Sequence, residues 1–337
     1  MTEPLHVLCD DRKSEIRYVY HLSDIHIRNY QRHEEYLKVF DQTYQSLQSL
    51  INDQKETSLI VLTGDIMHTK TELSPESISI ACSFFKRLSD IAPVMMIAGN
   101  HDCNLSNKRR LDALTPLVED IGGNSVSDLI SEANEEFPSL RSDLKNFYYL
   151  KRSGFYQYHN IVFGISSLLD EKLITIKELD SKKFNKIKQA KKYKIALYHG
   201  PIYKSTTESD FIIRHNCLKS STFDGYDYVM LGDIHKHQYI NEKKTIAYAG
   251  SLIQQSHGES INNHGILKWN LLNGKSKLHE VSNDYGYCTI EIKDGKMIPT
   301  EIPKKPHIRF CLENTSEIQY RKVKELSYIK YFSRTPF

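Results

Sequence analysis

Five short apolar runs in this chain end at residues whose side chains can bind divalent metals. The runs lead into these segments: Asp24-Ile25-His26, Gly64-Asp65, Gly99-Asn100-His101-Asp102, His199-Gly200 and Gly232-Asp233-Ile234-His235. Short β-branched and aromatic runs that stop at glycine are typical of buried strands entering tight loops. The carboxyl ends of such strands share one edge of an α/β sheet, where sites form. The pattern therefore predicts one convergent metal centre.

Asp24 and His26 stand two residues apart. We predict that this segment is extended, which would point the carboxylate and the imidazole to the same side. An aspartate in a loop beside an incidental histidine would give the same pair, so the two residues alone leave both interpretations open.

The remaining candidate ligands complete two coordination shells. The two oxygens of Asp65 can bridge two ions held about 3.5–4 Å apart. Asn100 adds a neutral oxygen, and His199, Asp233 and His235 supply further donors. Ligation without thiolates favours manganese, with iron or magnesium as alternatives, over a structural zinc. Two such ions activate a shared water and hold the attacking and leaving oxygens of a phosphate ester, so phosphoester hydrolysis is the predicted reaction.

Amphipathic helices are expected between the first of these strands. The helix within Glu34–Glu56 carries the apolar stripe Leu37, Phe40, Tyr44, Leu47 and Ile51. A second helix begins at Ser74-Pro75-Glu76, with Ile78, Cys82, Phe85 and Leu88 facing inward. A third ends at Gly122-Gly123 and carries Leu111, Leu114, Leu117, Val118 and Ile121. Stripes at three- and four-residue spacing indicate helices packed on a sheet.

The second half of the chain reads as strands and turns. Phe147–Leu150 and Ile161–Ile165 have no helix between them, and short strands such as Thr245–Tyr248 and Gly265–Trp269 follow. We therefore expect two sheets packed face to face, one flanked by helices and one rich in hairpins.

The segment Gly99-Asn100-His101-Asp102, taken with Asp24-x-His26 and Gly64-Asp65, resembles the calcineurin-like metallophosphoesterases. That resemblance implies an α/β fold, a four-layer αββα sandwich of two mixed sheets. Finer segments look like the nuclease subunit of the double-strand-break repair complex, a branch that includes bacterial SbcD. These segments are Leu111–Pro116, Phe147–Leu150 and Ala249–Glu259, and the resemblance extends over roughly Arg17 to Glu280.

The resemblance also implies roles for single residues. The first ion would be held by Asp24, His26, Asp65 and His235, and the second by Asp65, Asn100, His199 and Asp233. His101 would face the substrate as transition-state stabiliser or proton donor, with Asp102 holding its imidazole in position. His68 matches a histidine that helps place the DNA strand; the alternative is a histidine at a helix start that is satisfied by the backbone.

One motif departs from the family pattern. The family usually carries Gly-His-x-His where this chain has Gly232-Asp233-Ile234-His235. Aspartate keeps a donor of similar reach and adds negative charge, which favours a hard ion such as manganese. His237 would be a ligand instead if the register of this motif were shifted.

Contacts with DNA are expected from two places. Lys108, Arg109 and Arg110 follow His101 closely and would approach a phosphate backbone, unless they are solvent-facing charge at a helix start. Gly250 and Ser251 would offer backbone N–H groups to a phosphate, as the family segment does. The lysine-rich run 182–194 is either a further DNA contact or a solvated helix face.

Composition sets the wider limits. A net charge of +3 and a pI near 8.3 permit a basic face without requiring one. Six scattered cysteines without a Cys-x-x-Cys pair indicate reduced thiols in an intracellular protein, cytoplasmic or nuclear. We expect no membrane span, a polar leader over residues 1–16, a phosphoesterase domain over 17–300, and a tail or partial capping domain over 301–337.

The sequence therefore predicts a two-metal DNA nuclease, exo- or endonucleolytic, that works in repair or recombination. Its expected partners are DNA, an SMC-like ATPase and a second copy of the chain. Two alternatives stay open: a phosphoesterase of the same fold that acts on substrates other than DNA, and a scaffold that binds DNA or an ATPase with little turnover.

Overall fold

The structure is a computed structural model that describes residues 5–8, 14–107, 110–122, 124–125, 146–170, 172–179, 192–298 and 300–332. The chain divides into two compact units. The first contains residues 1–253 and 263–281, and the second contains residues 254–262 and 282–337.

Two mixed sheets of seven strands form the first unit. One sheet has the order β14-β13-β2-β3-β4-β6-β5. Its strands in chain order are β2 (Tyr18–Leu22), β3 (Ser58–Thr63), β4 (Val94–Ile97), β5 (Asn124–Ser125), β6 (Phe147–Tyr149), β13 (Gly265–Asn270) and β14 (Lys275–Glu280). The other sheet has the order β1-β7-β8-β9-β10-β12-β11. Its strands are β1 (Leu5–Leu8), β7 (Gly154–Tyr158), β8 (Ile161–Ser166), β9 (Tyr193–His199), β10 (Tyr228–Gly232), β11 (Gln238–Tyr239) and β12 (Ile246–Tyr248).

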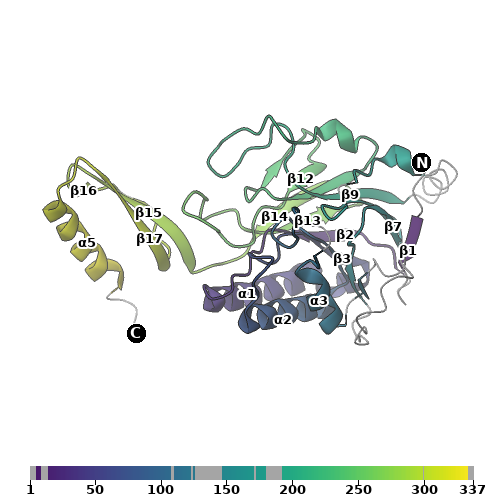
Figure 1. Cartoon of the computed structure of the whole chain (residues 1–337), viewed down its shortest axis with the longest axis horizontal. Helices are drawn as coiled ribbons and strands as arrows, with labels where there is room; N and C mark the ends of the chain where they lie inside the picture. Colours follow the sequence, from purple (N-terminus) through teal and green to yellow (C-terminus); the bar gives the residue numbers. More distant parts are fainter. Residues whose placement is uncertain are drawn as a thin grey trace. The chain divides into compact units, whose positions relative to one another are not determined.

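Helices cover one face of the sheet that contains β2, β3 and β4. They are α1 (His33–Ile51), α2 (Pro75–Ile91) and α3 (Leu114–Asp120), which lie side by side in Figure 1, with the 3-10 segment η1 (Asn52–Thr57) after α1. The side chain of Ser74 caps α2 by accepting the backbone N–H of Ser77, and Pro75 occupies the first turn. Over the other sheet, the described cover includes the 3-10 segments η2 (Ile176–Glu178) and η3 (Ser220–Phe223).

Strand residues alternate between two apolar cores. In β3, Leu59 and Val61 lie between the two sheets, while Ile60 and Leu62 face the helices. Both faces of the strand are therefore buried, which explains why its sequence is a continuous apolar run rather than an alternating one. The predicted α/β sandwich of two mixed sheets is confirmed.

The expected helical stripes are right except at their first residues. Leu37, Ile78 and Leu111 are exposed, whereas the later members of each stripe are buried. In α1 the buried side chain one turn before Phe40 is Tyr36, whose hydroxyl donates to the carbonyl of His26 at 2.5 Å. The helix therefore faces the sheet with Tyr36, four residues before Phe40, and not with Leu37, three residues before it.

The second unit has its own small sheet. The strands β15 (Tyr285–Lys293) and β17 (Lys305–Glu313) pair in parallel over their whole length, and β16 (Lys296–Met297) pairs with β15. The helix α5 (Glu317–Phe332) follows. Part of the predicted tail or partial capping domain is therefore ordered, because β17 lies within residues 301–337 and pairs with β15. Among the described residues, none of the helices has the length and apolar character needed to cross a bilayer.

A buried histidine between the sheets makes the acid stability of the fold testable. His21 is fully buried on β2 and contacts the hydroxyl of Thr63 at 2.8 Å. Burial, with the nearby His237, lowers the pKa of His21 to about 3. Below pH 6.5 this histidine becomes protonated in the unfolded chain but stays neutral in the folded chain. The free energy of unfolding therefore decreases as the pH is lowered.

We predict that His21→Gln, which cannot titrate, loses less stability than the wild type as the pH falls. The difference should grow by about 1.4 kcal/mol per pH unit between pH 6 and 4, measured by urea unfolding with chelator present. Parallel stability profiles for the two proteins would contradict the buried neutral imidazole.

Candidate metal centre

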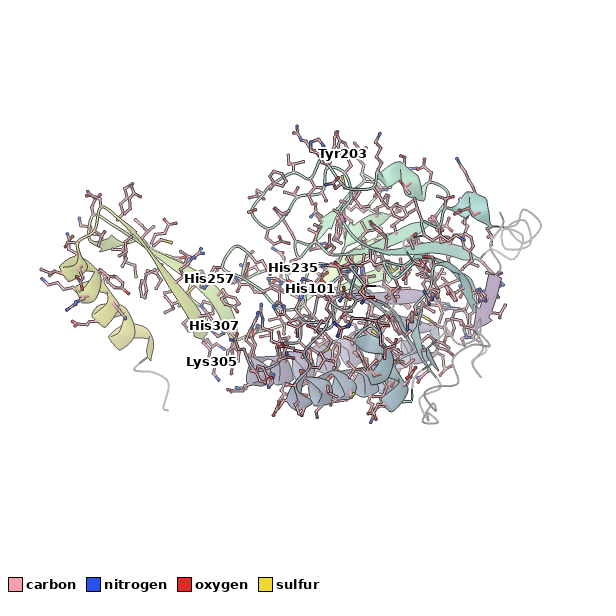
Figure 2. All side chains as sticks on the ribbon, viewed as in Figure 1. His101, Tyr203, His235, His257, Lys305 and His307 are labelled. Atoms are coloured by element: carbon pink, nitrogen blue, oxygen red, sulfur yellow. The ribbon has the colours of Figure 1, made fainter. Side chains whose placement is uncertain are left out.

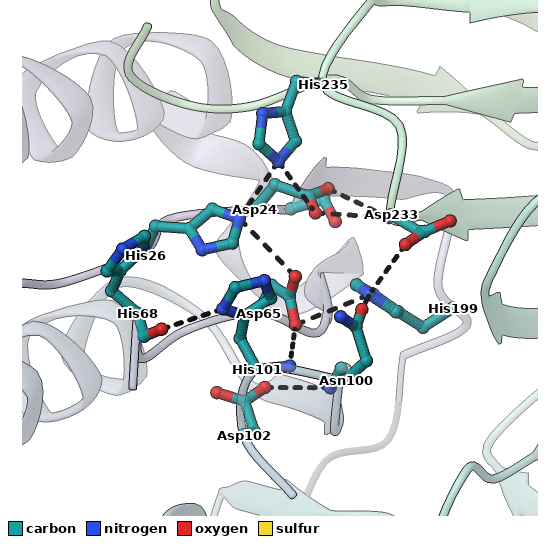
Figure 3. Close-up of polar contacts among 12 residues, drawn as sticks. Asp24, His26, Asp65, His68, Asn100, His101, Asp102, His199, Asp233 and His235 are labelled. Carbon is teal, nitrogen blue, oxygen red and sulfur yellow. Dashed lines mark hydrogen bonds and ion pairs between the residues drawn. The ribbon is translucent and has the colours of Figure 1, made fainter. Parts of the chain in front are cut away.

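The expected ligands meet because their strands run parallel and end at the same edge. β2, β3 and β4 are parallel neighbours in one sheet, and β9 and β10 are parallel neighbours in the other. The last residue of β9 and the loops after the other four strands bring seven side chains together, as Figure 3 shows: Asp24, His26, Asp65, Asn100, His199, Asp233 and His235. Every ligand predicted from the sequence therefore lies in the cluster.

The local backbone at these loops differs from the expectation. Asp24 and His26 both have a φ of 52°, and Asp65 has 53°, in the left-handed region that non-glycine residues rarely adopt. The segment that carries Asp24 and His26 is thus not extended. Their side chains share one site because two left-handed residues turn the chain after β2, and such strained positions gather at functional sites.

The carboxylate of Asp65 lies between two histidines. Its Oδ2 is 3.5 Å from Nε2 of His26, and its Oδ1 is 3.5 Å from Nε2 of His199. The backbone N–H of His101 also donates to Oδ1 at 2.8 Å. Each oxygen of one buried carboxylate therefore faces a different imidazole, which is the arrangement that a bridging ligand needs.

The first half of the cluster contains two facing imidazoles. Nε2 of His26 and Nε2 of His235 are 3.0 Å apart, and Nε2 of His235 is 3.8 Å from Oδ1 of Asp24. Two nitrogens bound to one ion at about 2.0–2.1 Å each lie about 3 Å apart when they are adjacent ligands. The donor set of this half fits a divalent ion.

The second half is built around His199. Its Nδ1–H donates to the carbonyl of Thr63 at 2.7 Å, which leaves Nε2 to face the oxygen of Asn100 at 3.0 Å and that of Asp233 at 3.9 Å. A carbonyl that fixes the tautomer and ring orientation of a histidine is the usual support of a metal ligand. Thr63 was not singled out in the sequence, because a backbone carbonyl leaves no signature in residue types.

Two glycines allow the loops to approach this closely. A Cβ added at Gly99 would lie 2.1 Å from Oδ1 of Asp65. Gly64 has a φ of 92°, and a Cβ there would lie 2.7 Å from Nδ1 of His199. The glycine before each ligand therefore serves packing around Asp65 as well as the turn itself.

The cluster concentrates negative charge in a buried place. Burial raises the pKa of Asp24 to about 6. Burial alone would also raise the pKa of Asp65, but His199 and His26 outweigh it and hold that pKa below its usual range. Burial would lower the pKa of His199, yet Asp65, Asp24 and Asp233 raise it well above normal. A positive charge between these carboxylates is therefore stabilised.

The residues expected to act on the substrate lie beside the cluster. The ring of His101 is 4.8 Å from that of His26 and stacks on His68 at 5.5 Å. Its Nδ1–H donates to the carbonyl of His68 at 2.8 Å. His68 itself lies in a loop seven residues before α2 rather than at a helix start, and its Nε2 accepts from Arg28 at 3.1 Å.

Asp102 does not hold the imidazole of His101, contrary to what the resemblance implies. Its buried carboxylate accepts the backbone N–H groups of Gly99 at 2.8 Å, Met67 at 2.8 Å and Ile66 at 3.3 Å. It therefore joins the loop after β4 to the loop after β3. A side chain at this position organises the two loops that carry Asp65 and Asn100, and His68 takes over the role of orienting His101.

The predicted DNA contacts are placed only in part. Ser251 is buried, and its N–H donates to the carbonyl of His235 at 3.0 Å, so it supports that ligand instead of offering the N–H to a phosphate. Gly250, with a φ of 82°, is also buried beside the same carbonyl. Arg110 is exposed. Lys108, Arg109 and most of the lysine-rich run lie outside the described residues.

The unusual last motif has the expected register. His235 faces His26, whereas Nδ1 of His237 donates to the carbonyl of Tyr248 at 2.7 Å and its ring contacts Tyr239. His237 is not in any of the candidate metal groups found among the described residues.

Arg28, which contacts His68 beside the cluster, was not predicted from the sequence. Its position two residues after His26 was a usable signal.

Comparison with known proteins identifies a family and one close relative in sequence. A model of the calcineurin-like phosphoesterase family matches residues 18–237. The uncharacterized protein R555 of Acanthamoeba polyphaga mimivirus is 55% identical over 316 residues, which is 94% of this chain and 22% of that protein. The chain thus spans about a fifth of the length of this relative.

Two solved structures of cold-active protein tyrosine phosphatases overlap weakly. One has a TM-score of 0.34 with 14% identity, and covers 82% of this chain and 81% of that chain. The other, from a psychrophilic Shewanella species, has a TM-score of 0.32 with 13% identity over 82% of both chains. At TM-scores this low, the two structures give no information about the substrate of this chain.

We predict that Asp233→Ala weakens metal binding in the second half of the cluster, because it removes a carboxylate that faces His199. The variant should bind about one equivalent of Mn²⁺ where the wild type binds two, measured by titration calorimetry or elemental analysis. His237→Ala is the matched control and should keep both. Loss of metal in His237→Ala alone would show that the ligand register is wrong.

Proposed function

Because the chain belongs to the calcineurin-like phosphoesterase family, we propose that it is a two-metal nuclease that hydrolyses DNA phosphodiesters in double-strand-break repair or recombination. The observation that carries the phosphoesterase chemistry is the Asp65 carboxylate, whose two oxygens face His26 and His199 at 3.5 Å each. The choice of DNA is supported by the branch-like segments Leu111–Pro116, Phe147–Leu150 and Ala249–Glu259.

We propose the following ligands for the two ions. Asp24, His26, Asp65 and His235 would hold the first, and Asp65, Asn100, His199 and Asp233 the second. Oxygen and imidazole donors without a thiolate favour manganese, and the extra carboxylate of Asp233 adds to this preference. When bound, two divalent ions activate water and neutralise charge on a phosphate ester.

The chain's own residues supply the proton and the orientation. The bond from Nδ1–H of His101 to the carbonyl of His68 fixes the ring. In the imidazolium form, Nε2 would carry the second proton and would deliver it to the leaving oxygen. Asp102 keeps the loops around Asp65 and Asn100 in place without contacting the substrate. In a repair complex, an SMC-like ATPase and a second copy of the chain are the partners we propose.

DNA cleavage by the purified chain tests this proposal. We expect it to cleave labelled single- or double-stranded oligonucleotides with Mn²⁺, and to stop when a chelator is added. His101→Ala should retain two ions and lose turnover by about 10²–10⁴-fold, the usual contribution of a positioned acid–base group.

A phosphomonoester assay runs beside the DNA assay. Hydrolysis of p-nitrophenyl phosphate without any DNA cleavage would favour a phosphatase of the same fold. Two bound ions with neither activity would favour a scaffold. Loss of metal from His101→Ala would show that this residue is a ligand rather than the proton donor.

A further inference from the structure

A cation lies directly beside the residues that we place at the substrate. Arg28 follows His26 by two residues, and its Nη1 donates to Nε2 of His68 at 3.1 Å. The carbonyl of His68 in turn accepts from His101. A guanidinium carries five N–H donors in a planar fork, and it stays charged at any working pH. Its planar fork suits phosphate oxygens.

An exposed aromatic ring follows two residues later. Tyr30 has 79% of its surface exposed, the largest fraction among the large hydrophobic side chains in the described ranges. The Cα atoms of Arg28 and Tyr30 can be at most about 7 Å apart. The two residues therefore belong to one short segment, in which the side chain of Arg28 contacts His68 beside the metal centre.

The segment that presents Tyr30 is anchored on one side by Asn29. This side chain is buried, and its Nδ2 donates to the hydroxyl of Thr69 at 3.2 Å and to the carbonyl of Glu72 at 2.7 Å. Ser74 closes the link, because its hydroxyl donates to the carbonyl of Asn29 at 2.6 Å. Asn29 thus ties this segment to the loop that carries His68 and to the start of α2.

The other side is anchored by Arg32. Its guanidinium donates to both oxygens of Glu35 at 2.8 and 2.9 Å, and both side chains are buried. Tyr30 is therefore held outward between two fixed residues. Because the loop is already fixed, binding of a ligand to the exposed ring would cost little additional conformational entropy.

We infer that Arg28 and Tyr30 form a nucleotide-recognition rim, in which Arg28 binds the phosphate next to the scissile one and Tyr30 stacks on the base of the same nucleotide. This inference rests on the proposed function and extends it to a strand with at least two phosphates. A cation for the backbone and a ring for the base are the two elements with which proteins hold single-stranded nucleic acid. A substrate with one phosphate and no base would use neither.

Binding of a fluorescent single-stranded oligonucleotide tests the two residues separately. Tyr30→Ala should raise Kd by about 5- to 150-fold, the range for loss of one stacked base, whereas Tyr30→Phe should stay within about twofold. Arg28→Gln should reduce the slope of log Kd against log salt by about 0.7, because one phosphate contact is lost, and Arg28→Lys should restore it. Each variant should retain two equivalents of Mn²⁺.

Matched controls lie elsewhere on the molecule. Tyr203→Ala removes another exposed tyrosine, which Figure 2 shows well away from His101 and His235. Arg87→Ala removes an arginine that pairs with Asp41 at 2.7 Å on the helical side. Neither change should alter Kd by more than about twofold. Tyr30→Ala matching these controls, or Arg28→Gln with an unchanged salt slope, would overturn the inference.

The proposed function can fail separately. If the wild type cleaves the oligonucleotide while the Arg28 and Tyr30 variants behave like the controls, only the rim is wrong. If it hydrolyses bis(p-nitrophenyl) phosphate but neither binds nor cleaves the oligonucleotide, the DNA substrate and the rim both fail. Recovery of binding by a protein partner but not by DNA would assign the exposed ring to a protein interface and overturn the inference as well.

Discussion

The buried carboxylate of Asp65 is the group on which the rest of this centre depends. It accepts the N–H of His101 and faces His26 on one side and His199 on the other. His101 and His26 come from the loops after β4 and β2, and His199 is the last residue of β9, so one side chain joins three strand ends. A carboxylate so placed among imidazoles is stable because the opposite partial charges surround it, and two cations would extend the same principle.

The two sheets and their glycines make that position possible. His199 comes from one sheet and donates to the carbonyl of Thr63 in the other, at 2.7 Å. Gly99 leaves the space that Oδ1 of Asp65 occupies, and Asp102 closes the neighbouring loops through backbone N–H groups. The ligands are held in place by backbone contacts that cross from one sheet to the other. Their positions therefore depend on how the two sheets pack together.

The ligand types and the strand ends could be predicted from the sequence, because both appear in local residue patterns. Asp24, His26 and Asp65 share the site as expected, but the left-handed backbone that brings them together leaves no trace in residue types. The true roles of Asp102 and Ser251 depend on which distant N–H or carbonyl lies nearby. Such partners are set by tertiary packing. For the same reason, the first member of each predicted helical stripe was exposed rather than buried.

Metal stoichiometry of Asp65→Asn tests the account most directly, since the change keeps the size of the side chain and removes its charge. We expect the folded variant to lose Mn²⁺ from both halves of the centre, whereas Asp41→Asn, a change in an exposed carboxylate on α1, should retain two equivalents. Elemental analysis of both proteins after dialysis provides the measurement. A folded Asp65→Asn protein that still holds two equivalents of Mn²⁺ would contradict the bridging role and, with it, the two-metal centre proposed here.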